Sequence, residues 1–470
     1  MQRALTIAHE EWAFWLALVW FAYLVGLSGW IALQKREPVA TLSWIMSLAL
    51  LPVVGLLIYH WFGPQRIVRH RLKRLRARAR IEDVQPGAKP APDTSTLMRL
   101  AQGSSGFQPS SAQDVSLLVD GTATFDALVE AISQARDHVH LEYYIFDPDR
   151  TGTRLRDALI ERARAGVTVR LLLDALGSAA TPHGFLAPLA QAGGQIAWFH
   201  GFRLRRLWRP RINLRSHRKI VVVDGRIGFT GGINISDTQD PALRADAFHD
   251  LHLRLEGDVV RWLQLAFAED WVYASGQPAA SESMWPELAA GSVRVQVLPA
   301  GPDSPWETIH RVLLAAVHSA RHRVWLVTPY FVPGEAARMA LTSAALRGLD
   351  VRLLVPERSD SRLVTAAARS YFDELIAAGV RVYEYPHMVH AKALLVDADT
   401  CVLGSSNFDN RSFRLNFELC VLFEDAGVAQ ALDAVLTRDF SLALQIPAGR
   451  TTALRGRLAE ALARLLSPLL

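Results

Sequence analysis

The chain has 470 residues, half of them apolar, and carries a net charge of +5. This length suits two domains, or one duplicated domain, better than a single core. Its two cysteines, Cys401 and Cys420, lie in apolar runs typical of buried strands, which excludes a disulfide framework and indicates a reducing compartment. The chain has no CxxC or HExxH spacing, so we predict no metal site.

Two long apolar runs stand near the amino terminus. Residues 12–33 and residues 39–62 contain no Asp, Glu, Lys or Arg. Each run is long enough for a helix to cross a bilayer core of about 30 Å, and the short connection between them leaves room only for a turn. We therefore predict a transmembrane helical hairpin over residues 1–63. A cleaved signal peptide fits less well, because Glu10 and Glu11 precede the first run. The alternative for the second run is a buried core helix.

A basic juxtamembrane segment and linker follow, over residues 64–95. Eight Lys and Arg fall between Arg66 and Arg80. The positive-inside rule places this segment, and everything after it, in the cytoplasm. The same side chains either bind an anionic leaflet or form a solvated basic helix that only sets the orientation. Pro and Gly residues after Ile81 are typical of a linker.

The remaining chain is one α/β pattern written twice. From Val115 onward, apolar strand-like runs alternate with amphipathic helical runs. The run that starts after Ala135 has its counterpart after Ala320, and the later strands correspond in the same way. We predict two tandem α/β/α repeats, residues 96–280 and 281–445, related by a pseudo-two-fold axis with a site at their seam.

One template stands near the end of each repeat: His, any residue, Lys, four residues, Asp, then Gly or Ser and an Asn. The interval from His to Asn is 17 residues in both repeats. His and Lys two positions apart share one face of a strand, and the apolar residues that follow predict a strand buried on both faces. Such a strand would not carry His and Lys at its end unless they served a site. The template residues are His217, Lys219, Asp224, Gly232 and Asn234 in the first repeat, and His390, Lys392, Asp397, Ser405 and Asn407 in the second.

Bringing the two templates together would place two His and two Lys in one pocket. Lysines and Asn amides, helped by Gly232 and Ser405, could clamp the oxygens of a phosphodiester. Histidines on opposite sides of phosphorus could divide the work, one attacking and one protonating the leaving oxygen. The spacing therefore predicts phosphodiester chemistry, with Asn234 and Asn407 among the phosphate-binding groups.

The paired HxKxxxxD motif resembles the signature of the phospholipase D superfamily, over roughly residues 96–445. Within that superfamily, Leu141-Glu142-Tyr143-Tyr144 and Thr328-Pro329-Tyr330-Phe331 are similar to the bacterial cardiolipin synthases. The resemblance implies a covalent phosphatidyl-histidine, with His217 as nucleophile and His390 as general acid, then base. It also implies a catalytic set that comprises His217, Lys219, Asp224, His390, Lys392 and Asp397.

Two further carboxylates follow the motifs in matching strand contexts, Asp250 in the first repeat and Glu418 in the second. A carboxylate on the far ring nitrogen of a histidine fixes its tautomer and supports its cationic form. We give this orienting role to both residues as a hypothesis. The alternative is that they are ordinary surface or structural carboxylates.

The resemblance and the hairpin together imply a lipid transferase of the bacterial inner membrane. Two phosphatidylglycerol molecules would give cardiolipin and glycerol without any cofactor, since one phosphodiester replaces another. Three alternatives stay open: a hydrolase that yields phosphatidic acid, a synthase that uses phosphatidylethanolamine as co-substrate, and a non-catalytic membrane adaptor. A homo-oligomer also stays open.

Two stretches favour contact with lipid. Residues 202–219 interleave eight Lys and Arg with apolar residues, which fits an anionic membrane surface. A nucleic-acid groove is the rival, and the hairpin disfavours it, so we predict no nucleic-acid partner. The tail, residues 446–470, ends in a basic amphipathic helix that either docks on the bilayer or packs on the domain.

Overall fold

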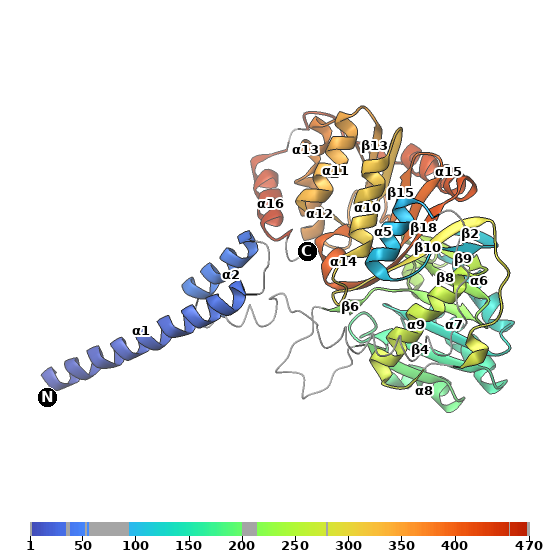
Figure 1. The fold of residues 1–470 in the computed structure, drawn as a ribbon, viewed down its shortest axis with the longest axis horizontal. Coiled ribbons are helices and arrows are strands. Elements are labelled where there is room, and N and C mark those ends of the chain that lie inside the picture. The colour runs from blue at the N-terminus through green and yellow to red at the C-terminus, as the bar shows by residue number, and fades with distance from the viewer. Residues whose placement is uncertain are drawn as a thin grey trace. The chain divides into compact units, whose positions relative to one another are not determined.

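The amino-terminal part contains two helices in the region of the predicted hairpin. The computed structural model describes residues 2–33, 38–51, 54–55, 94–199, 214–278, 281–450 and 452–467. Helix α1 spans Gln2–Ala32 and α2 spans Pro38–Leu50 (Figure 1). Ile31 packs against Leu48 between them. No helix among the described residues has both the length and the hydropathy that crossing a membrane requires. Residues 56–62, the basic run from Arg66 to Arg80 and residues 200–213 lie outside the described residues.

The first repeat is built on one mixed sheet with the strand order β2-β9-β8-β7-β3-β4-β5. Strands β3, β4 and β5 are parallel to one another, and the other neighbours pair antiparallel. The strands are β2 (Asp114–Val119), β3 (His138–Tyr143), β4 (Thr168–Asp174), β5 (Gln195–Phe199), β7 (Ile220–Val223), β8 (Ile227–Gly231) and β9 (Leu251–Glu256).

The second repeat has the same strand order and the same directions, β10-β18-β16-β15-β11-β13-β14. The predicted duplication is therefore present in the topology, strand for strand. The strands are β10 (Val293–Ala300), β11 (Arg323–Val327), β13 (Asp350–Pro356), β14 (Arg381–Tyr385), β15 (Ala393–Val396), β16 (Thr400–Gly404) and β18 (Asn416–Glu424), and β19 (Leu444–Gln445) extends the edge beyond β14.

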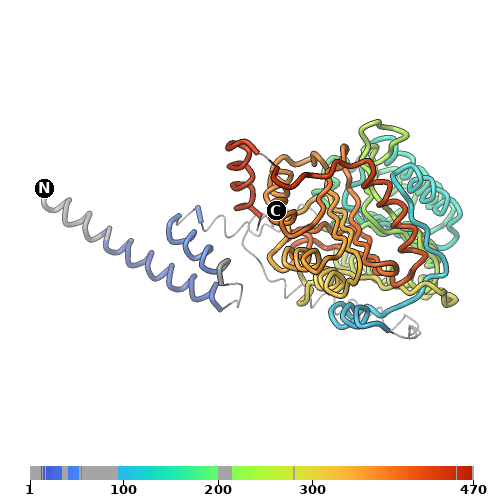
Figure 2. The backbone as a smooth tube through the Cα atoms, turned by 90° about the horizontal axis from the view of Figure 1, so that it is seen from above, coloured from blue at the N-terminus to red at the C-terminus, as the bar shows by residue number. Residues whose placement is uncertain are grey.

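Helices cover the outer faces of both sheets and also fill the space between the sheets (Figures 1 and 2). Helices α6 (Asp120–Ser133), α7 (Arg150–Arg164) and α8 (His183–Gln191) cover the first sheet. The second sheet is covered by α10 (Thr308–Ser319), α11 (Glu335–Leu346), α12 (Arg362–Arg369) and α13 (Phe372–Ala377). The central core contains α9 (Val259–Ser275) and α15 (Ala426–Leu442).

The two motif strands β7 and β15 are buried on both faces, as their apolar sequences predicted. Ile220 and Val222 enter the central core, while Val221 and Val223 enter the outer core of the first repeat. The strand β15 alternates in the same way between the central core and the outer core of the second repeat. Every side chain of both strands is therefore packed, and the strands hold the residues that precede them rigidly.

The segment before the first repeat packs with the second one. Helix α5 (Thr96–Ser105) buries Met98 and Ala101 in the outer core of the second repeat, and β1 (Ser110–Ala112) pairs with β10. The domain boundary predicted at residue 96 grouped this segment with the first repeat. Its few apolar side chains pack against residues of the second repeat, and proximity in the sequence does not predict this contact.

Candidate active site

Each motif histidine is tied by its backbone to the other repeat. The short strand β6 (Arg215–Ser216) runs parallel to the start of β18, and the N–H of His217 donates to the carbonyl of Phe417 at 2.8 Å. In the second repeat the N–H of His390 donates to the carbonyl of His249 at 2.6 Å. Phe417 and His249 directly precede Glu418 and Asp250 in the chain. This crossed pairing sets each histidine beside a carboxylate from the opposite repeat.

The structure brings the His, Lys and Asn residues of both templates into one cavity of about 460 Å³ at the seam of the two repeats. The two histidines, which lie 173 positions apart in the chain, therefore face a common space, as the paired motifs predicted. Among the described residues, no three His, Cys, Asp or Glu side chains gather as metal ligands would. The template residues that line the cavity are His217, Lys219, Asn234, His390, Lys392, Ser405 and Asn407.

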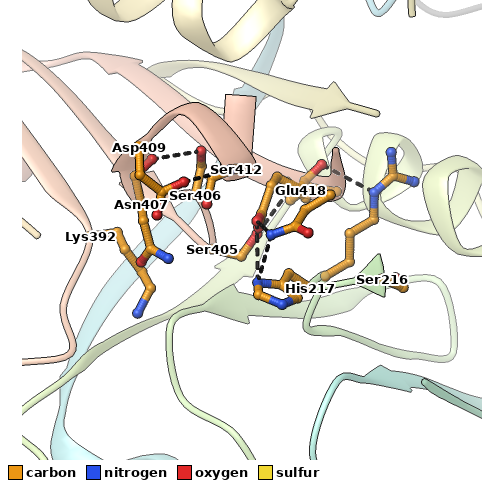
Figure 3. A network of polar contacts seen from close by, with 12 residues as sticks. Ser216, His217, Lys392, Ser405, Ser406, Asn407, Asp409, Ser412 and Glu418 are labelled. Carbon is orange, nitrogen blue, oxygen red and sulfur yellow. Dashed lines mark hydrogen bonds and ion pairs between the residues drawn. The ribbon is translucent and has the colours of Figure 1, made fainter. Parts of the chain in front are cut away.

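The carboxylate beside His217 is Glu418, which is fully buried. Its Oε1 lies 3.3 Å from Nδ1 of His217, and Ser405 Oγ donates to its other oxygen at 2.5 Å (Figure 3). Asn416 Nδ2 donates to Glu418 at 3.1 Å and lies 3.2 Å from the same ring nitrogen. Burial alone would raise the pKa of Glu418, but His217 and Lys219 lower it. An ionised Glu418 can therefore support a positive charge that develops on His217.

The carboxylate beside His390 is Asp250, also fully buried, with Oδ2 at 2.6 Å from Nδ1 of the ring. Burial alone would raise the pKa of Asp250, but Lys392 and His390 lower it to about 2. Burial lowers the pKa of His390, and Lys392 lowers it further, to about 4, against the opposing effect of Asp250. Both carboxylates thus take the position that the orienting hypothesis requires, each on the histidine of the other repeat.

Two buried lysines supply the positive charge of the cavity. Nζ of Lys219 donates to the carbonyl of His217 at 2.8 Å, and Nζ of Lys392 donates to the carbonyl of His390. Burial lowers the pKa of Lys219 to about 8 and that of Lys392 to about 7, in both cases against nearby carboxylates. An anionic phosphodiester between them would favour their charged forms and bind more strongly for that reason.

The four residues predicted to bind phosphate do not share one role. Asn234 and Asn407 line the cavity, and the buried Oδ1 of Asn407 has no hydrogen-bond partner among the described residues. Ser405 lines the cavity too, but its hydroxyl is engaged with Glu418. Gly232 does not line the cavity. A Cβ at Gly232 would lie 2.1 Å from Oδ1 of Asp250, so the glycine leaves the space that this carboxylate occupies.

Asp224 and Asp397 do not reach the cavity, although the family resemblance implied that they belong to the catalytic set. They follow β7 and β15, so each lies five residues beyond its lysine, about 17 Å along the strand. Both have positive φ, 52°, and both carboxylates accept backbone hydrogen bonds at the start of the neighbouring strand. The donors are the N–H groups of Arg136, Asp137 and His138 for Asp224, and those of Arg321, His322 and Arg323 for Asp397.

Several cavity residues were not singled out for the site from the sequence. The ring of Tyr144 lies 4.1 Å from that of His217, and Arg215, Tyr330 and Arg411 line the same space. Asn416 lies two positions before Glu418, and alternation along a strand would have placed them on one face. No comparable signal marks Tyr144, because its position beside His217 depends on packing between segments distant in the chain.

Comparison with known proteins places the chain in a family. A family model described as "Cardiolipin synthase, PLD-like domain" matches residues 128–271 and 313–440. Cardiolipin synthase 1 of Bacillus anthracis is 36% identical over 97% of this chain and 94% of its own length. The cardiolipin synthase of Geobacillus kaustophilus is 38% identical over 94% of this chain and 91% of its own.

Among solved structures, a phosphatidylserine synthase of Haemophilus influenzae matches 80% of this chain and 100% of its own, with a TM-score of 0.61 and 14% identity. That likeness shows the α/β fold alone, and the family match identifies its two tandem repeats as phospholipase D-like. The family match and the curated relatives go further, and the chain belongs to the cardiolipin synthase family.

Proposed function

We propose that this enzyme transfers a phosphatidyl group from one phosphatidylglycerol to a second, giving cardiolipin and glycerol. The observation that carries the proposal is the shared cavity, where two histidines face each other's repeat, each on a buried carboxylate. Family membership supports the same reaction class. The proposal is more specific than this class, because it names phosphatidylglycerol as both donor and acceptor.

The first step forms a covalent intermediate on His217. Its Nε2 attacks phosphorus, the bond from phosphorus to the glycerol headgroup oxygen breaks, and His390 gives that oxygen a proton. Burial and Lys392 lower the pKa of His390, so His390 must take up this proton from solvent as the anionic substrate binds. The substrate's negative charge offsets Lys392, which is one cause of the low pKa, and so favours a protonated His390.

The second step returns the enzyme to its starting state. His390 takes a proton from a hydroxyl of the second phosphatidylglycerol, whose oxygen then attacks phosphorus and displaces His217. Lys219 and Lys392 hold the non-bridging oxygens through both steps, helped by the amides of Asn234 and Asn407. Because these donors are fixed in a buried site, they need no reorganisation as negative charge develops on the non-bridging oxygens.

We also propose that the α1–α2 hairpin associates with the bacterial inner membrane, with the catalytic repeats on the cytoplasmic side. Trp12, Phe14, Trp15 and Phe21 on α1 are exposed by more than half, as lipid-facing side chains would be. If this is right, alkaline carbonate will leave the full-length protein in the membrane fraction and detergent will release it. Release by carbonate would contradict an inserted hairpin.

The activity is tested with purified full-length protein and defined lipids. With phosphatidylglycerol alone, we expect equal amounts of cardiolipin and glycerol by mass spectrometry. Phosphatidic acid without cardiolipin would show a hydrolase instead. If cardiolipin formed only when phosphatidylethanolamine was added, with release of ethanolamine, this lipid would be the donor. The double variant His217→Ala, His390→Ala is the control, and undiminished activity in it would contradict the assigned site.

A further inference from the structure

The carboxyl-terminal helix α16 (Leu454–Leu465) faces the solvent with its apolar side. Leu454, Leu458, Leu462 and Leu465 follow the helical period along one stripe, and each is 55–78% exposed. An amphipathic helix on a soluble domain normally turns such a stripe towards the core. Here the stripe has no partner among the described residues of the catalytic domain.

The opposite side of α16 holds the helix to the domain. Ala463 is buried in the outer core of the second repeat. Glu460 pairs with Arg450 at 2.7 Å, and the guanidinium of Arg464 lies 4.5 Å from the ring centre of Tyr371. The hydroxyl of Ser467 lies 2.9 Å from that of Tyr371. Small and polar contacts thus fix the helix with its leucines turned outward.

The helix adjoins the wall of the active-site cavity. It packs against α12 and lies at the outer edge of the domain in both views (Figures 1 and 2). On α12, Leu363 is 41% exposed, and its neighbour Val364 lines the cavity together with Asp360. A surface bound to the leucine stripe would therefore lie against the same helix that borders the reacting groups.

Size and charge favour a lipid surface over a second copy of the chain. A helix of this length is about 18 Å long and about 10 Å wide, so its stripe offers roughly 200 Å². A stable protein interface takes about 800 Å² from each partner. Arg455 and Arg457 are exposed on the same helix, and cations beside an apolar stripe are typical of helices that lie in anionic interfaces.

We propose that the leucine stripe of α16 inserts into the interfacial layer of an anionic bilayer and holds α12 and the adjoining cavity at the membrane surface. The contact is separate from the amino-terminal hairpin, and it rests on the proposed function in that the substrates lie in that bilayer. It would let a lipid headgroup enter the cavity while its acyl chains stay in the membrane.

Insertion can be measured at one position of the full-length protein. The native Cys401 and Cys420 are buried, so an environment-sensitive fluorophore will label a new surface cysteine selectively. The label at Leu462→Cys is compared with one at Glu161→Cys on α7, where the side chain is 70% exposed. In phosphatidylglycerol vesicles that contain lipids brominated on their acyl chains, we expect quenching at position 462 and none at 161.

Two results would overturn the inference. One is a label at 462 that is quenched no more than the label at 161. The other is a blue shift at 462 that appears without vesicles and grows with protein concentration, because this would assign the stripe to a second copy of the chain.

A pair of variants connects insertion with activity. Leu458→Glu with Leu462→Glu places charge on the stripe, whereas Leu458→Met with Leu462→Met keeps it apolar at the same positions. On vesicles we expect the first pair to lose about tenfold in rate and the second to stay within about twofold. On monomeric short-chain phosphatidylglycerol all forms should be equally active. Equal loss on both substrates would contradict a membrane role. If the wild-type protein made no cardiolipin from either substrate, the proposed function would be refuted instead.

Discussion

The two halves of the active site have the same topology but different chemical support. His217 receives Glu418, which Ser405 and Asn416 hold from two sides. His390 receives the shorter Asp250, which has Leu251 N–H at 2.7 Å and the space left by Gly232. A longer carboxylate with side-chain donors in one half thus corresponds to a shorter carboxylate with backbone support in the other. The duplication preserves the position of the carboxylate beside each histidine, but the residues that pack around the carboxylate differ between the halves.

The halves also differ in the cations beside those carboxylates. Arg218, fully buried, pairs with Asp270 at 2.5 Å and donates to the carbonyl of Glu418 at 3.1 Å. Its counterpart in the second motif is Ala391. Likewise His249, which precedes Asp250, corresponds to Phe417. The first repeat therefore supplies both of these side chains, and the two repeats are not equivalent at the seam.

His249 is the second of these cations and joins the repeats directly. Its ring nitrogens lie 2.7 Å from Asp120 in the first repeat and 3.0 Å from Asp439 on α15 in the second. Burial alone would lower the pKa of His249, but the hydrogen bonds to the two carboxylates raise it to about 10. The cation is therefore present at neutral pH, where it holds the segment that carries Asp250.

The largest effect should come from removing either histidine. His217→Ala and His390→Ala should each lower kcat by about 10⁴-fold, as loss of a nucleophile or its proton partner does. A trapping experiment distinguishes the two histidines, since only the nucleophile carries the phosphatidyl group. Peptide mass spectrometry of quenched enzyme should find the adduct on the peptide with His217. An adduct on the peptide with His390 would reverse the assignment.

The exchange of Gly232 and Ser405 tests the asymmetry of the carboxylates. Gly232→Ser should lose about 100-fold in kcat, because its Cβ would displace Asp250 from His390. Ser405→Gly removes one hydrogen bond to Glu418 and should cost about tenfold or less. Steady-state kinetics on matched, folded preparations measure both. Equal losses in the two variants would show that the halves are interchangeable here.

His249→Gln tests the cation at the seam through its pH dependence. The folded pKa, about 10, lies above the ordinary value of 6.5, so the stabilisation is complete below about pH 6.5 and disappears as pH rises through 10. The variant should be less stable than the wild type by about 3 kcal/mol at pH 6.5. Thermal unfolding should show this gap closing towards pH 10. A gap that stays constant with pH would mean that the ring contributes by packing and not by charge.

The smallest effect should come from the two aspartates beyond the motif strands. Asn tolerates positive φ, so Asp224→Asn and Asp397→Asn remove charge without straining the turn. We expect each to lower the free energy of unfolding by about 1–2 kcal/mol and to leave KM and kcat of the folded enzyme unchanged. Denaturant titration and kinetics on the same samples measure both. A large fall in kcat with unchanged stability would return these residues to the catalytic set.

Local patterns were enough to predict the repeats, the doubly buried strands and the polar residues at their ends. The sequence also matched Asp250 with Glu418, because their strand contexts repeat. The common spacing did not separate the roles of the motif residues: His217 and Asp224 belong to one template, yet they lie at opposite ends of a strand. A spacing reports that residues are fixed relative to one another, and not that they share a site.

By itself, the sequence determined the duplication and the chemistry of the paired motifs, because one pattern recurs in it with fixed spacing. It also determined the apolar faces of the strands, because these follow the alternation of neighbouring residues. Only the tertiary structure decided that each carboxylate serves the other repeat's histidine, that α5 joins the second repeat, and that α16 turns its leucines outward. These choices depend on which surfaces meet after the strands have formed. Their free energies arise between residues that are distant in the chain, where no periodicity records them.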